Sequence, residues 1–211
     1  DLTVGVCTIN SVDVSGSFVN GGGGTYTLTY TVTEGNTDRA SGALPISCIL
    51  AEPSGNEVTV SSFGANTLVV DANSPTGYTI DFDQAYANNA NEAGISFTFA
   101  GAEVGATYNY SIDDTNATTP AVTGTSTIST ATDQITGIDV STLDDETLTI
   151  TVTLTDPAGN AETGVTDTIA KDTSDPTITG ATIDQNTGTA IIGGTITATL
   201  TAGGSQADLT V

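Results

Sequence analysis

The sequence predicts an all-β chain, because apolar and polar side chains alternate in one segment after another. In 147–155, TLTITVTLT, the apolar residues share one face and threonine occupies the other. The segments 25–33 (TYTLTYTVT) and 195–201 (TITATLT) follow the same rule. A period of two in β-branched and aromatic residues is typical of strands with one buried and one exposed face. No apolar pattern of helical period persists for three turns, so we expect essentially no helix.

Two similar linkers divide the chain. DANSPT at 71–76 and DTSDPT at 172–177 each carry Asp, then Pro four residues later, then Thr. The two prolines lie 101 residues apart, which is the size of a small β-sandwich. The stretch between them holds seven predicted strands, a number typical of an immunoglobulin-like sandwich. These strands span about 78–83, 94–99, 106–112, 121–128, 134–140, 147–155 and 163–170.

The chain begins and ends with the same four residues, DLTV, at 1–4 and 208–211. Residues 1–71 lack the first strands of a sandwich, whereas 174–211 hold first strands and lack the rest. We therefore predict tandem immunoglobulin-like sandwiches, one complete at 72–173 and one split across the chain termini. The first part supplies the C-terminal strands of the split sandwich and the last part its N-terminal strands. If the second DLTV marks a recurrence of the first, the repeat period is 207 residues.

Charge excludes several classes of partner. The chain has 25 acidic residues against two basic ones, Arg39 and Lys171, for a net charge of −23. Nucleic acid is excluded because phosphate binding needs clustered Lys and Arg. Anionic membrane surfaces are disfavoured, and no apolar stretch is long enough for direct membrane insertion. Salt or divalent cations would screen the repulsion between carboxylates; plain solubility is the alternative interpretation.

The two cysteines, Cys7 and Cys48, predict a disulfide. They lie outside any CxxC motif, and the chain has no histidine to complete a metal site. A disulfide indicates an oxidising, extracellular location. Closing a loop of roughly 40 residues would stabilise the fold by about 4 kcal/mol on the chain-entropy model. Two buried free thiols are the alternative.

The sequence favours no catalytic function. Without histidine, a nucleophile with a positioned base cannot be assembled around Lys171, which we expect in a linker. Carboxylate pairs at Asp81 with Asp83 and at Asp144 with Asp145 would suit a glycosidase, but such enzymes need a cleft lined by aromatic residues, and these strands have only scattered Tyr and Phe. Intramolecular isopeptide bonds need a lysine in the core, and we expect Lys171 at the edge of the middle domain. We predict that the chain is not an enzyme.

Calcium is the predicted ligand, because it binds six to eight oxygens from Asp, Asn and backbone carbonyls. The linkers place such residues where domains meet, and an ion there would neutralise repulsion and stiffen the joint. The candidate ligands are Asp71, Asn73, Asp81, Asp83, Asp156, Asp172 and Asp175. In the alternative interpretation, Asp156 and Asn160 cap the DPAGN turn and the other acids are solvated surface.

Four segments carry a family resemblance: TLTYTVTEGNTDRASGALPI (27–46), AEPSGNEVTV (51–60), DPTITGATID (175–184) and IIGGTITATLT (191–201). They resemble a bacterial Ig-like domain that is common in very large surface proteins. Two further segments resemble a related repeat: ISFTFAGAEVGATYNYSI (95–112) and TLTITVTLTDPAGNAETGVTDTIAKD (147–172). The chain departs from the family at Glu52, where Asp is usual, and in its cysteine pair.

The resemblance implies a segment of a secreted, repetitive adhesin or surface filament, such as those of gliding Bacteroidetes and marine bacteria. The predicted function is a stalk or spacer whose partners are neighbouring repeats, or copies of the same protein, in an end-to-end filament. Alternatives are a pilin-like subunit that polymerises by strand donation, and a glycan- or ice-binding module. Asn116 lies in an N-glycosylation sequon, and Thr168 in Asp-Thr-Ile resembles a bacteroidetal O-glycosylation site.

Overall fold

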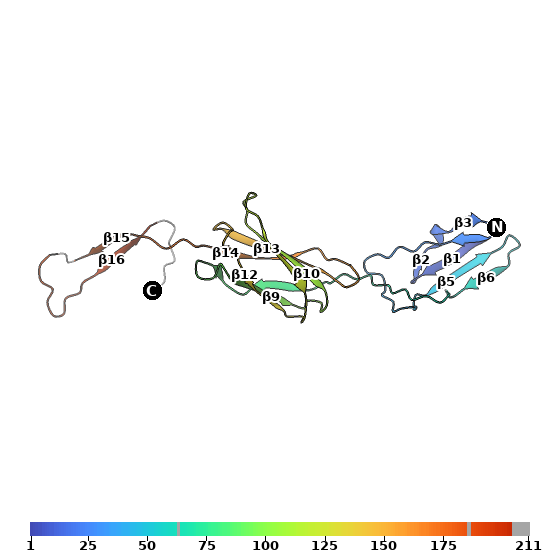
Figure 1. Cartoon of the computed structure of the whole chain (residues 1–211), viewed down its shortest axis with the longest axis horizontal. Helices are drawn as coiled ribbons and strands as arrows, with labels where there is room; N and C mark the ends of the chain where they lie inside the picture. The colour runs from blue at the N-terminus through green and yellow to red at the C-terminus, as the bar shows by residue number, and fades with distance from the viewer. Residues whose placement is uncertain (63, 185–186, 204–211) are drawn as a thin grey trace.

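The computed structural model describes residues 1–62, 64–184 and 187–203, and strands make up nearly all of its regular structure. Within these residues the regular helix is limited to one 3₁₀ turn, η1 (Ser15–Ser17), so the all-β prediction is confirmed. No helix in the described ranges is long and apolar enough to cross a membrane. Three parts follow one another along the long axis: an N-terminal part (β1–β6), a middle part (β7–β14) and a C-terminal hairpin (β15–β16) (Figure 1).

The N-terminal part is built on one four-stranded antiparallel sheet. Its strand order is β2-β1-β5-β6, and β3 pairs with β4 in a separate two-stranded ribbon. The strands are β1 (Thr3–Ile9), β2 (Val12–Asp13), β3 (Val19–Gly22), β4 (Thr25–Thr27), β5 (Ile46–Ala51) and β6 (Glu57–Val60). The fully buried core is small and consists of Cys7, Ile9, Val14 and Cys48.

The middle part has two sheets. A five-stranded sheet has the order β11-β10-β13-β14-β8, and a three-stranded sheet has the order β12-β9-β7. The strands are β7 (Thr79–Phe82), β8 (Tyr86–Ala87), β9 (Ile95–Ala100), β10 (Thr107–Asp113), β11 (Val122–Thr127), β12 (Gln134–Ile138), β13 (Thr147–Thr155) and β14 (Val165–Lys171).

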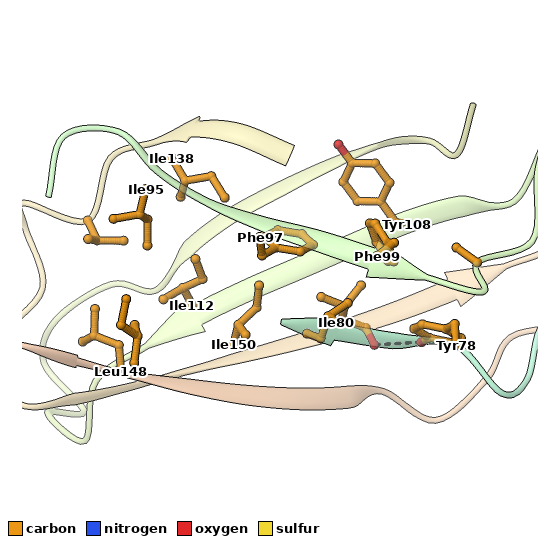
Figure 2. Packing of buried hydrophobic residues seen from close by; sticks show 14 of the residues in the cluster. Tyr78, Ile80, Ile95, Phe97, Phe99, Tyr108, Ile112, Ile138, Leu148 and Ile150 are labelled. Carbon is orange, nitrogen blue, oxygen red and sulfur yellow. Dashed lines mark hydrogen bonds between the residues drawn. The ribbon is translucent and has the colours of Figure 1, made fainter. Parts of the chain in front are cut away.

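Side chains from both sheets of the middle part form one continuous core (Figure 2). Four apolar residues of β13, Leu148, Ile150, Val152 and Leu154, are completely buried, as the alternation in TLTITVTLT predicts. Each such side chain stabilises the fold by about 1.5–3 kcal/mol relative to leaving it exposed. The threonines between them lie on the outer face.

The C-terminal hairpin contains β15 (Ile178–Ile183) and β16 (Ala198–Ala202), paired antiparallel. Its large apolar side chains are uncovered: Ile183 is 49% exposed and Leu200 is 67% exposed. Two strands alone cannot enclose a core, because a lone hairpin has nothing to bury its apolar face against.

The prediction of a strand over 25–33 is largely wrong, since the strand ends at Thr27. The backbone after Thr27 is hydrogen-bonded to the Ser17 side chain instead of to a neighbouring strand. The Ser17 hydroxyl accepts the N–H of Thr29 at 2.8 Å and donates to its carbonyl at 3.1 Å. Leu28 and Tyr30 still pack on the N-terminal core. The alternating pattern is therefore present, but no neighbouring strand pairs with this segment in the part of the chain described.

The immunoglobulin-like topology, the bounds of the three predicted domains and the split arrangement stay predictions. The second DLTV, at 208–211, lies outside the described residues.

Candidate functional site

The most distinctive polar site is the joint at 71–76, and one acidic turn binds it to the N-terminal part. Asp38 Oδ1 accepts the backbone N–H of Ala72 and the side-chain amide of Asn73, each at 2.8 Å. The N–H of Gly35 donates to the carbonyl of Ala72 at 3.0 Å. Three hydrogen bonds thus fix the first half of the linker against the end of the N-terminal part.

The same joint is also bound to the middle part. Ser74 bridges the two sides, because its N–H donates to Glu34 at 3.2 Å while its hydroxyl donates to Glu162 at 3.3 Å. Asn160 donates its side-chain amide to the carbonyl and to Oδ1 of Asp71, both at 3.3 Å. Since contacts on both sides restrict a linker that would otherwise permit domain motion, the joint is expected to be stiff.

Asp156 organises the turn that faces this joint. Its Oδ1 accepts the backbone N–H groups of Ala158, Gly159 and Asn160 at 2.7–2.9 Å. Burial acts to raise the pKa of Asp156, but these bonds and one from the Asn160 side chain lower it overall. The geometry therefore matches the turn-capping alternative, because the carboxylate oxygens are already engaged by the turn's own donors.

Glu103 experiences the negative charge that gathers at the joint. Burial is the main cause that raises the pKa of Glu103, and repulsion from Asp156 and Asp71 adds to it. Two carboxylates from separate segments therefore act electrostatically on Glu103.

The other predicted calcium ligands lie elsewhere. Asp83 accepts hydrogen bonds from the hydroxyls of Ser96 and Thr98 and from the Gln134 amide, and Asp81 is exposed on β7. Asp172 and Asp175 line a surface hollow of about 520 Å³ at the second linker. The seven candidates thus occupy three places. Over the described residues, no group of three or more Asp, Glu, His or Cys side chains is arranged to hold a metal ion.

The second linker follows a buried lysine. Lys171 is the last residue of β14 and only 5% exposed; its Nζ donates to the carbonyl of Leu143 at 2.6 Å and lies 3.0 Å from Glu92 Oε2. Asp145 accepts the N–H of Thr173 at 3.0 Å and its hydroxyl at 2.9 Å. The expectation that Lys171 lies in a linker is wrong, because it is the last residue of β14, and the loops carrying Leu143 and Glu92 cover its side chain and satisfy its charge.

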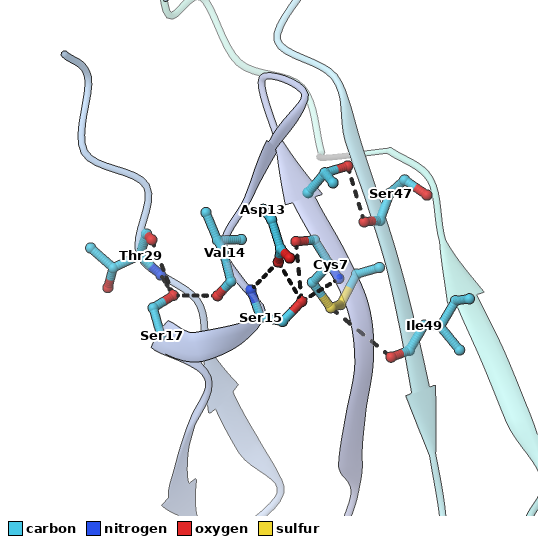
Figure 3. Close-up of a disulfide and its surroundings, with 10 residues drawn as sticks. Cys7, Asp13, Val14, Ser15, Ser17, Thr29, Ser47 and Ile49 are labelled. Atoms are coloured by element: carbon cyan, nitrogen blue, oxygen red, sulfur yellow. Dashed lines mark hydrogen bonds between the residues drawn. A yellow bond between two sulfur atoms is a disulfide. The ribbon is translucent and has the colours of Figure 1, made fainter.

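The predicted disulfide between Cys7 and Cys48 is confirmed (Figure 3). The two cysteines are directly opposed on β1 and β5, so the bond links neighbouring strands of one sheet. The N–H of Cys7 donates to the Ser15 hydroxyl at 2.8 Å, and Ser15 donates to Asp13 at 2.6 Å. The disulfide is therefore enclosed by a turn that is itself hydrogen-bonded.

The two predicted glycosylation sites lie among ordinary hydrogen-bonded and strand residues. The Asn116 amide donates to Asp144 at 2.8 Å, and its oxygen accepts the N–H and hydroxyl of Thr118. Thr168 is exposed on β14 opposite Thr149. Glycosylation at Asn116 and Thr168 stays a prediction, as does the absence of catalysis.

Comparison with known proteins finds similarity to solved structures, two of which are given below. No family model matches the sequence, and no curated protein does. A tetra-tandem repeat in the extending region of a large adhesion protein is 24% identical over 70% of this chain, with a TM-score of 0.38. A Ca²⁺-stabilized adhesin that helps an Antarctic bacterium reach out and bind ice is 17% identical over 84%, with a TM-score of 0.39. This chain covers 35% and 41% of those chains. Both are adhesins, the class that the sequence resembles.

Proposed function

We propose that the chain is a spacer segment of a secreted cell-surface adhesin or extracellular filament. The observation that carries this proposal is the joint at 71–76, which is hydrogen-bonded to the parts on both sides. A spacer must convert sequence length into distance and resist bending. Each sandwich adds roughly 40 Å, from strands of seven to nine residues at about 3.3 Å per residue plus a linker. The disulfide supports an extracellular location.

Stiffness of the joint can be tested by NMR on the intact chain. Residual dipolar couplings measured for the N-terminal and middle parts should report one common alignment tensor. Asp38→Ala removes the acceptor of two linker hydrogen bonds and should make the two tensors diverge. Glu57→Ala, on an exposed position of β6, is the matched control and should leave them equal. Two unrelated tensors in the unmodified chain would refute a stiff spacer.

Calcium at the first joint belongs to this proposal. The raised pKa of Glu103, from burial and from repulsion by Asp156 and Asp71, supports it, because a cation there would relieve the same repulsion. The melting temperature in calcium should then be higher than in EDTA, whereas magnesium at equal ionic strength should raise the melting temperature little. Equal melting temperatures in all three solutions would contradict a calcium site at this joint.

Glycan or ice binding is a second candidate, supported by the outer face of the five-stranded sheet. Threonines face one another across β13 and β14 at Thr149 with Thr168 and at Thr151 with Thr166. Flat rows of hydroxyls suit an ordered, hydroxyl-rich surface, although threonine is also common in strands. Null results for thermal hysteresis and on a glycan array would remove this candidate.

A further inference from the structure

The C-terminal hairpin repeats one pairing of the middle part. In the middle part β7 pairs with β9 through Thr79 with Ala100, and so on to Phe82 with Phe97. In the hairpin, Gly180 pairs with Thr201 and the register runs to Ile183 with Ala198. Every β7–β9 residue pair therefore recurs 101 positions later, which is also the separation of the two linker prolines. Over its described residues, the hairpin is therefore the equivalent of the β7–β9 pair.

The N-terminal part contains the complementary strands. Its sheet order β2-β1-β5-β6 matches the order β11-β10-β13-β14, and every adjacent pair in both runs is antiparallel. The order along the chain matches as well, since β1 and β2 precede β5 and β6 as β10 and β11 precede β13 and β14. Among the described strands of the N-terminal part, none occupies the place of β7 or β9.

Apolar surface is exposed on both the C-terminal hairpin and the N-terminal part. Phe99 of β9 is completely buried, but Leu200, its equivalent in β16, is 67% exposed. The corresponding face of the N-terminal sheet is only partly covered, because Leu28 and Tyr30 pack on its core and leave Val58 exposed. Val58 of β6 is 53% exposed and points to the same side as buried Cys48, two residues from its partner Val60. The exposed apolar side chains of the hairpin and those of the N-terminal part could therefore cover one another.

The strand-like segment that lacks a ladder, 28–33, is explained by the same comparison. In the middle part, β12 comes at the corresponding place before the central strand pair, and it pairs with β9. Among the described strands of the N-terminal part none is equivalent to β9, so 28–33 has an alternating sequence and no described strand beside it. The free edge of β16 is the edge that β9 uses for β12.

We propose that the C-terminal hairpin docks on the N-terminal part of a second copy of this chain. Leu200 and Ile183 would cover the exposed part of that face around Val58, and the edge of β16 would pair with 28–33 by strand addition. The interface is heterologous, since the two surfaces differ, and head-to-tail repetition therefore gives open chains. This inference deepens the proposed spacer role and relies on it for the end-to-end geometry.

Sedimentation of the full chain over a concentration series tests the docking. Unmodified chains should form head-to-tail oligomers that lengthen with concentration. Leu200→Asp removes one surface and Val58→Asp the other, so each variant alone should associate at least tenfold more weakly. An equimolar mixture of the two variants should recover dimers and nothing longer, because one intact interface remains. Val104→Asp, on an exposed position of the middle part, is the matched control and should assemble normally.

All three substituted side chains are already exposed, so circular dichroism should confirm unchanged folding. A monomeric chain at all concentrations, or variants that assemble as well as the unmodified chain, would overturn the proposal. If the chain stays monomeric yet shows one alignment tensor, the docking proposal is wrong and the spacer proposal stands. If the chain assembles yet shows unrelated tensors, the stiff-spacer proposal is wrong and the docking proposal stands.

Discussion

Removal of the disulfide should destabilise the N-terminal part and leave the middle part unchanged. The double substitution Cys7→Ser with Cys48→Ser opens a loop between residues 41 positions apart. On the chain-entropy model that loop contributes about 4 kcal/mol. A part of about 70 residues has a total stability of roughly 3–10 kcal/mol. Because the fully buried core of this part is small, the loss should leave it marginally stable or unfolded.

Hydrogen exchange read by mass spectrometry resolves the two parts separately. A loss of 4 kcal/mol corresponds to a roughly 10³-fold fall in amide protection over β1 and β5. Protection over β10 and β13 should not change. Treatment of the unmodified chain with a reductant is the matched control and should give the same pattern. An equal loss of protection in the middle part, or a loss below about 1 kcal/mol in the N-terminal part, would refute the reasoning.

Three further changes probe the middle part. Tyr78→Phe removes a buried hydroxyl that donates to a main-chain carbonyl at 2.9 Å and should cost about 1 kcal/mol in urea unfolding, whereas Tyr86→Phe, on an exposed ring, should cost nothing measurable. The pKa of Asp156 is lowered on folding overall, so its stabilisation is present above the unfolded value of about 3.9 and is lost as pH falls through the lower folded value. Asp156→Asn should therefore flatten the fall in stability as the pH drops below about 4, and identical pH profiles would contradict this. Lys171→Met leaves Glu92 without its ammonium partner and should cost about 2–3 kcal/mol, less than a fully buried pair because that carboxylate is 20% exposed. Adding Glu92→Gln should recover part of the loss, and no recovery would argue against the ion pair.

Local pattern was enough to predict most strands of the middle part. TLTITVTLT is a strand over its whole length, since both neighbours needed for its ladder, β10 and β14, are present. The same kind of pattern failed at 28–33, because alternation reports a preference and a ladder also needs a neighbouring strand. The disulfide could be predicted because the chain offers just two cysteines.

The contacts of the joint could not be predicted in the same way. Asp38 and Glu162 meet a linker that lies 34 and 88 positions away in the sequence. The sequence gives no signal for which carboxylate accepts which linker donor. Burial of Lys171 likewise depends on loops that fold over the end of β14.

Small-angle X-ray scattering of the monomeric chain tests the central claim of an extended spacer most directly. A compact fold of this length would have a radius of gyration of about 17 Å. Three parts placed end to end at roughly 40 Å each should give a value of about 30 Å or more and a long tail in the pair-distance distribution. A value close to that of the compact fold, at a concentration where the chain is monomeric, would contradict the account.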